Sequence, residues 1–243
     1  MPAFEVLLPV GALALYLYDS VQGLYGDELM LERGRRGWRT SAGSGLLLGG
    51  RRPYLPSPLA PDAPVFRVRW DRPQEDGTLG AADVRAMAVP LRLPGLIVRV
   101  QLALLAIALP VVSIVLGAGR MLLAVFALYY LLSLVTLLLL VRARVVLQLT
   151  GRQLWLLAFE SIACAPFALN VVRKVGLLHS GRLRWAEVAA TTFDERERRE
   201  LGATIDALIA AELVLEDVDT PRAARLAELR TTIGARLGVA GSR

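Results

Sequence analysis

The chain has 243 residues, a formal net charge of +6 and 55% hydrophobic residues, which is above the usual share for a soluble globular protein. Its single cysteine, Cys164, excludes an internal disulfide, and its single histidine, His179, excludes a multi-histidine metal site. Apart from Lys174 and His179 the basic residues are all arginines, which suit phosphate recognition, but we favour a genome with arginine- and alanine-rich codon usage as the reason for this excess.

The first apolar segment runs from Phe4 to Tyr18 and is interrupted only by Glu5. No basic residue precedes this segment, so it lacks the start of a cleaved signal peptide. We therefore expect an uncleaved transmembrane helix within residues 1–25. To reach the length of a full span, this helix would have to continue through Asp19 to Leu24.

Residues 26–95 contain short extended stretches separated by prolines, and we expect them to form a small β-rich module. Glu28–Glu32 and Gly37–Thr40 flank a glycine-containing turn, which predicts a hairpin. Val65–Trp70 alternates apolar and arginine side chains, which indicates a half-buried strand. Ala81–Val89 predicts a short helix, because prolines follow it before the next apolar block.

The most apolar part of the chain is residues 96–141. Its two runs, Ile97–Leu116 and Met121–Val141, are each close to the roughly 20 helical residues that cross a hydrocarbon core. Gly117–Arg120 lies between them and supplies the turn. This block predicts a transmembrane helical hairpin.

Arginines gather on one side of all three predicted helices. They follow the first helix, precede the second and follow the third, while the hairpin turn contains only Arg120. Under the positive-inside rule, the N-terminus and the hairpin turn lie outside, and the long loop and the C-terminus lie in the cytoplasm. We therefore expect a multi-pass protein of the cell inner (plasma) membrane.

Residues 142–184 are the ambiguous part, because Leu154–Val172 is apolar but contains Glu160. A carboxylate inside the bilayer is costly, and a fourth crossing would export several cations. We favour an interfacial or re-entrant segment, with a fourth crossing as the alternative. Glu160 is our intramembrane polar candidate, and it would need a partner such as Arg152 or Asn170.

Residues 185–243 have the pattern of a C-terminal cytoplasmic helical pair. Asp194 predicts the N-cap of a helix with an apolar stripe over Leu201–Leu213. Pro221 predicts the start of a second helix, whose stripe runs over Leu226–Leu237. The fold class predicted from all these segments is an α-helical integral membrane protein with three transmembrane helices.

One acidic cluster offers a catalytic alternative. Asp19, Asp27 and Glu28 with the arginines that follow could hold a phosphorylated headgroup through a divalent cation. We favour solvated charges at the end of a helix, because the spacing matches no phosphotransferase signature.

Three other features receive structural interpretations. Ser41 and Ser44 lie in a turn-like sequence that nothing places beside His179, so we interpret them as turn residues. Gly49–Arg52 lacks the lysine and the following helix of a nucleotide-binding loop, so we interpret it as a turn. Cys164 is flanked by alanines and is interpreted as a buried small apolar residue.

The leading functional hypothesis is a non-enzymatic inner-membrane scaffold, anchor or accessory subunit that binds partners on the cytoplasmic face. The alternatives are an enzyme that acts on phospholipids or lipid-linked substrates at the inner leaflet, and a subunit of an oligomeric transporter or channel. We expect no catalytic, cofactor or metal site and no nucleic-acid partner. The expected partners are anionic lipid headgroups and either other membrane-protein subunits or further copies of the chain. The candidate headgroup contacts are Arg33, Arg35, Arg36, Arg39, Arg67 and Arg69, and the candidate partner contacts are Leu208 and Leu229.

Overall fold

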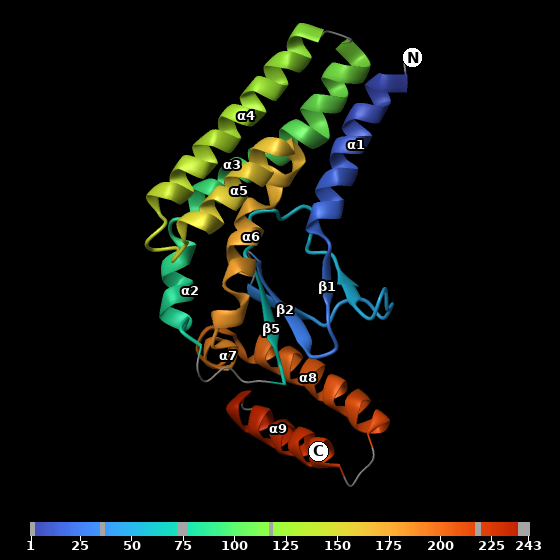
Figure 1. Cartoon of the computed structure of the whole chain (residues 1–243), viewed down its shortest axis with the longest axis vertical. Coiled ribbons are helices and arrows are strands. Elements are labelled where there is room, and N and C mark those ends of the chain that lie inside the picture. Colours follow the sequence, from blue (N-terminus) through green and yellow to red (C-terminus); the bar gives the residue numbers. More distant parts are fainter. Residues whose placement is uncertain (1–2, 35–36, 72–76, 117–118, 217–219, 238–243) are drawn as a thin grey trace. The chain divides into compact units, whose positions relative to one another are not determined.

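The chain forms two compact units in the computed structural model, which describes residues 3–34, 37–71, 77–116, 119–216 and 220–237 (Figure 1). The first unit comprises Met1–Val21, Leu55–Pro64 and Arg85–Leu178, and the second comprises Gln22–Tyr54, Val65–Val84 and His179–Arg243. Each unit combines segments that are distant in sequence. The β-rich loop and the C-terminal tail, which we expected as separate parts, contribute to the same unit.

Helices dominate the first unit. They are α1 (Ala3–Ser20), α3 (Arg92–Ala103), α4 (Gly119–Arg142), α5 (Gly151–Ala163) and α6 (Val171–Leu178), while α2 (Ala81–Ala88) precedes α3. The helix α3 continues through two π-helical turns, η1 (Leu104–Ala108) and η2 (Val111–Leu116). Pro110 lies between these turns and has no amide hydrogen, so the wider turns occur where regular helical bonding is interrupted.

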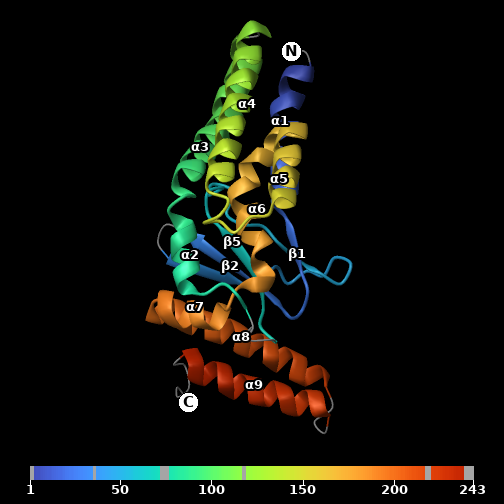
Figure 2. The ribbon, with the colours of Figure 1, turned by 60° about the vertical axis from the view of Figure 1, so that its left-hand side comes forward.

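The helices α3 and α4 run side by side in Figures 1 and 2. Arg92–Ser113 and Gly119–Arg142 are long and apolar enough to cross a membrane by length and composition, and only 28% of an apolar 18-residue stretch in each is buried. The buried amide of Gln101 joins the two helices, because it donates to the Ser133 hydroxyl at 2.7 Å and to the Tyr129 carbonyl at 3.2 Å. Gln101 and Ser133 are therefore bonded between the helices, while large apolar side chains of α4 such as Leu123 and Leu131 are exposed.

The first helix ends before Leu24, the residue to which it would have to continue to reach the length of a full span. It stops at Ser20, and Gln22–Leu24 forms strand β1 instead of continuing the helix. This part of the expectation over residues 1–25 is corrected. The short strand pairs in antiparallel register with β4 (Arg52–Tyr54), so its backbone groups bond to a distant segment and not to the preceding helical turn.

The segment expected to be interfacial or re-entrant consists of two helices and a break. The 13-residue α5 begins with a capping box between Thr150 and Gln153 and ends at Ala163. Pro166 lies in the 3-10 turn η3 (Ala165–Asn170), after which α6 follows. The two helices contact one another, which fits a chain that reverses direction at the break.

The second unit contains a three-stranded antiparallel sheet. Its order is β3 (Gly37–Ser41), β2 (Glu28–Gly34) and β5 (Val65–Arg69), and the predicted hairpin and half-buried strand are both confirmed. Phe66, Val68 and Trp70 are at most 3% exposed, whereas the arginines between them are partly exposed.

The C-terminal tail completes the core of this unit through α7 (Trp185–Thr192) and α8 (Glu195–Leu215). Phe193 stacks on Trp38 with ring centroids 5.1 Å apart. Glu197 accepts a hydrogen bond from the Trp38 amide at 2.7 Å. Gly37 has φ +130, and a Cβ there would lie 1.8 Å from a carboxylate oxygen of Glu197, so the bond depends on glycine at this position.

The predicted helical pair is formed by α8 and α9 (Pro221–Leu237), which lie against each other in Figure 2. Asp194 is the N-cap of α8, as predicted, and forms a capping box with Glu197. Arg230 donates two hydrogen bonds to Asp206 across the pair, and this bonding holds the pKa of the Asp206 carboxyl below its ordinary value.

The first testable prediction is that the tail is required for the fold of the β-rich loop. Truncation after Arg184 removes the side chains that cover Trp38, so we expect rapid proteolysis of the loop at Arg67 and Arg69. Limited proteolysis of the full-length and truncated proteins measures this effect. Truncation after Leu237 is the control and should leave the loop protected. Equal protection in all three proteins would contradict the shared core.

Candidate functional site

The most elaborate polar cluster of the first unit is centred on Arg173, which is 2% exposed. It lies near the start of α6, and its guanidinium is surrounded by acceptors from three segments of the chain. Those acceptors are the Tyr16 and Ser20 hydroxyls, the Asn170 side-chain oxygen and the backbone carbonyls of Ser57 and Ala60.

The backbone acceptors come from the proline-rich segment 55–64, which forms no helix or strand. Prolines remove amide donors, so carbonyls in such a segment are left without partners in regular structure. Arg173 satisfies two of these carbonyls, and the Tyr16 hydroxyl donates to a third, that of Pro58, at 2.6 Å. An ion pair between Asp62 and Arg99 ties the same segment to α3.

A second cation, Lys174, lies next along the chain and joins two carboxylates. Its ammonium group is 2.9 Å from Asp19 of α1 and 2.7 Å from Glu160 of α5. The polar candidate Glu160 thus has a partner, but that partner is Lys174 and neither Arg152 nor Asn170. Asn170 instead donates to Asp19 at 2.9 Å.

Sequence reasoning missed this cluster because the contacts of Arg173 and Lys174 with α1 and with the segment 55–64 join residues more than 100 positions apart. The local signal was the presence of Arg173 and Lys174 directly after an apolar stretch, which we used only for orientation. Chemically, the cluster supplies fixed charges and hydrogen bonds that hold α1, α5 and α6 together. It has two cations and two carboxylates among the residues named, so its charges balance.

The acidic residues proposed as a divalent-cation site are bonded to other groups. Asp27 forms an ion pair with Arg69, and Glu28 accepts from the Tyr25 amide at 3.0 Å. Asp19 belongs to the other unit and pairs with Lys174. Among the described residues, no group of three or more histidine, cysteine, aspartate or glutamate side chains is placed to hold a metal ion.

The six candidate headgroup arginines fall into three groups. Arg67 and Arg69 are used internally, because Arg67 lies 3.9 Å from Glu28 and Arg69 pairs with Asp27 and Asp71. Arg33 lies over the Trp38 ring, and Arg39 is exposed. Arg35 and Arg36 lie outside the described residues. The charges of Arg67 and Arg69 are therefore largely neutralised within the protein.

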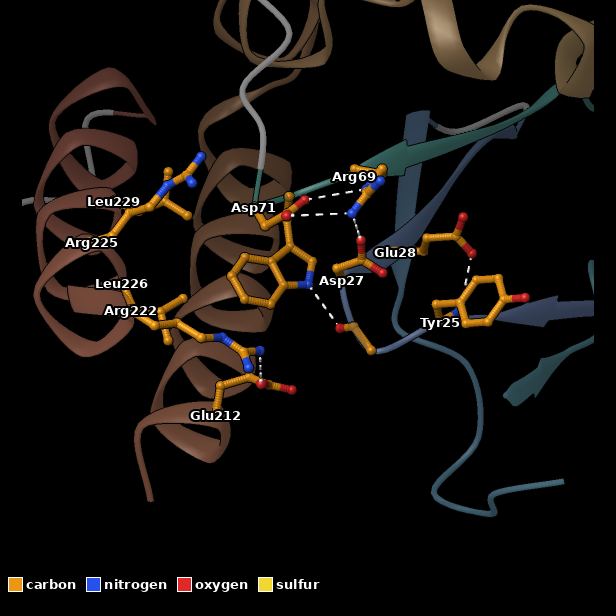
Figure 3. A pocket seen from close by; sticks show the side chains of 12 residues that line it. Tyr25, Asp27, Glu28, Arg69, Asp71, Glu212, Arg222, Arg225, Leu226 and Leu229 are labelled. Carbon is orange, nitrogen blue, oxygen red and sulfur yellow. Dashed lines mark hydrogen bonds and ion pairs between the residues drawn. The ribbon is translucent and has the colours of Figure 1, made fainter. Parts of the chain in front are cut away.

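The second unit contains a half-open pocket of about 740 Å³. Figure 3 shows that its side chains come from the turn before β2, from the end of β5 and from the pair α8–α9. The indole of Trp70 donates to the Gly26 carbonyl at 3.0 Å, which fixes the ring. With Leu226 and Leu229, Trp70 gives the pocket an apolar part.

Charged side chains surround this apolar part, and most of them are paired. Arg222 bonds to Glu212 at 2.9 Å and to Glu216 at 2.7 Å, and Arg69 bonds to Asp27 and Asp71. Arg225 is exposed and forms no ion pair with a carboxylate of the described chain. Within the described part of the chain, Arg225 is therefore a pocket guanidinium without a carboxylate partner, and it lies near the partly exposed Leu229.

The two leucines proposed as partner contacts have different environments. Leu208 is 8% exposed within α8, so its side chain supports the fold. Leu229 is partly exposed and lines the pocket.

The remaining candidates have structural roles. Ser41 accepts a hydrogen bond from the Gly43 amide and Ser44 from the Leu46 amide, so both oxygens serve their own turn. Gly49 and Gly50 form a turn, as predicted. Cys164 is only partly buried and follows the last residue of α5.

Comparison of the chain with protein-family models, with curated protein sequences and with solved structures found no match.

The second testable prediction concerns Arg173. Replacing it by alanine leaves several buried acceptors without a donor, so we expect a loss of at least about 3 kcal/mol in the free energy of unfolding. Arg173→Lys keeps the charge but has fewer donors, and its loss should be intermediate. Chemical denaturation in detergent micelles measures both. The control is exposed Arg144→Ala, which should change stability by less than about 0.5 kcal/mol. Equal stability of R173A and R144A would contradict the role of the cluster.

Proposed function

We propose that this protein is an integral membrane protein that anchors partner proteins at the cytoplasmic face. In this proposal α3 with its π-helical turns and α4 cross the inner membrane, and α5 with α6 re-enters it from the cytoplasmic side. The helix α1, with 18 residues, crosses beside them at the short end of the length range for a span. The second unit lies in the cytoplasm and holds the partner.

The observation that supports the membrane location is the outward-facing apolar surface of the first unit. A core helix of a soluble protein would be mostly buried, whereas only 28% of an apolar 18-residue stretch in each candidate span is buried. The exposed side chains on α4 include Leu123, Leu131 and Leu138, each more than half exposed. A continuous apolar surface of this kind is stable in lipid and promotes aggregation in water.

The break between α5 and α6 supports the re-entrant part of the proposal. At 13 residues, α5 is too short for a full crossing, which takes roughly 20. Its exposed side chains are nevertheless large and apolar, among them Trp155 and Phe159, which stack with centroids 5.5 Å apart. The contact of Lys174 with Glu160 compensates the one carboxylate that this segment carries into the apolar region.

The pocket of the second unit supports partner binding. Leu229 offers a partly exposed apolar contact over the buried Trp70 and Leu226, and Arg225 offers a cation without a described acidic partner. This combination fits a peptide segment that places an apolar side chain next to a carboxylate.

The two alternatives are less favoured. A phospholipid enzyme would need free carboxylates, and Asp27 is paired with Arg69 while Asp19 is paired with Lys174. A transporter subunit would need a polar path, but Gln101 of α3 bonds across to Ser133 of α4.

The third testable prediction tests partner binding at the pocket. A photo-crosslinking amino acid at Leu229 should give one adduct of defined mass in intact membranes, because this position lines the pocket. The matched control is Ala227, which lies two residues earlier and therefore about 200° around α9.

The variant Arg225→Glu in the Leu229 crosslinker protein should abolish the adduct while leaving the protein in the membrane. Gel analysis and mass spectrometry of the adduct measure the outcome. An adduct that forms equally at Leu229 and Ala227, or that survives Arg225→Glu, would contradict the proposed site.

A further inference from the structure

Three consecutive leucines are exposed at the tip of the loop between β3 and β4. Leu46, Leu47 and Leu48 are 69%, 67% and 66% exposed. Isolated exposed leucines are common on protein surfaces, but a contiguous exposed group is typical of a site that binds a membrane or another protein.

The tip has a defined backbone structure. Leu48 and Arg51 exchange two hydrogen bonds, with N–O distances of 2.8 and 3.1 Å. Gly49 and Gly50 between them have φ values of +57 and +78, which is the geometry of a two-residue hairpin turn with both central residues left-handed. The Ser44 amide also donates to the Pro53 carbonyl at 2.8 Å. The leucines are therefore held outward by a hairpin whose backbone is bonded across its arms.

The side chains that flank the leucines are basic. Arg51 and Arg52 form no ion pair with a carboxylate of the described residues. The Arg51 guanidinium lies over the Tyr25 ring, 4.6 Å from its centroid, and Tyr25 is 46% exposed. Apolar side chains beside cations and an exposed tyrosine match the layered chemistry of a membrane interface, with acyl chains below anionic headgroups.

The stem of the hairpin begins directly after α1 in the chain. Its stem strand β1 begins at Gln22, and α1 ends at Ser20. The stem strand β4 is paired with β1 and is four residues from Leu48 at its first residue, Arg52. Arg52 pairs with Leu24 and Tyr54 with Gln22, so the leucines extend from the end of the stem that is farther along β1 from α1.

We propose that Leu46–Leu48 inserts into the acyl region of the anionic inner leaflet while Arg51 and Arg52 bind its headgroups. This inference rests on the proposed membrane location of α1. A protein partner is the other candidate to cover the leucines. Such a partner would have to place an acidic group beside each arginine, whereas an anionic leaflet presents acidic groups over its whole surface. Arg51 and Arg52 thus replace Arg67 and Arg69 as the proposed headgroup contacts, because Arg67 and Arg69 lie beside carboxylates of the protein.

The fourth testable prediction uses the full-length protein reconstituted in vesicles that contain phosphatidylglycerol. In a Cys164→Ser background, a fluorescent label on Leu47→Cys should be quenched by nitroxides attached to lipid acyl chains. A label on Ala227→Cys of α9 is the exposed control and should not be quenched. Replacing both arginines by glutamine should lower the partition of the tip into lipid about tenfold or more, since each cation contributes on the order of a fivefold preference near an anionic surface.

A label on Leu131→Cys of α4 separates failure of this inference from failure of the proposed function. Quenching at position 131 without quenching at position 47 would overturn the insertion of the tip and leave the membrane location standing. A blue-shifted but unquenched label at position 47 would mean that protein covers the leucines, and this also overturns the inference. Absence of quenching at both positions would overturn the proposed function together with the inference.

Discussion

The burial of Arg173 is the constraint on which the first unit depends. A guanidinium removed from water must have its charge and its donors satisfied by protein, because an unpaired buried cation is strongly unfavourable. Here the acceptors for the two terminal nitrogens come from the last turns of α1, from η3 and from the proline-rich segment 55–64, while Nε has no hydrogen-bond partner among the described residues. Those three segments can supply the acceptors only when they meet, so one side chain determines how the chain passes the C-terminal end of α1.

Pairing with a carboxylate distinguishes the arginines that support the fold from those that are available for binding. Arg67 and Arg69 lie beside Glu28 and Asp27, at and just before the neighbouring strand β2, and these carboxylates neutralise their charges. Arg51, Arg52 and Arg225 have no such partner among the described residues and lie next to apolar surface. Cations next to exposed apolar groups are suited to binding an amphipathic target, and this is why the hairpin tip and the pocket carry the two binding proposals.

Local pattern predicted the local structure well. The alternation over Val65–Trp70 predicted β5, and Asp194 predicted the start of α8, because the causes of both act within a few residues. The pairing of β1 with β4, the packing of Phe193 on Trp38 and the partner of Glu160 were not predicted. These contacts join distant residues, and nothing in a single sequence specifies which distant segments meet.

The central claim is that α3 and α4 form a membrane hairpin and that α5 with α6 re-enters the membrane. Measuring on which side of the membrane the two ends of the α5–α6 segment lie tests this claim most directly. Single cysteines replace Val145 before α5, Gly181 after α6 and Gly119 at the start of α4, all exposed positions, in a Cys164→Ser background. Labelling with a membrane-impermeant maleimide is then compared in intact cells and in inside-out vesicles. Our account predicts labelling of positions 145 and 181 only in the vesicles, and of position 119 only in the cells. Labelling of positions 145 and 181 from opposite sides would contradict the re-entrant segment, and labelling of all three from one side would contradict the membrane hairpin.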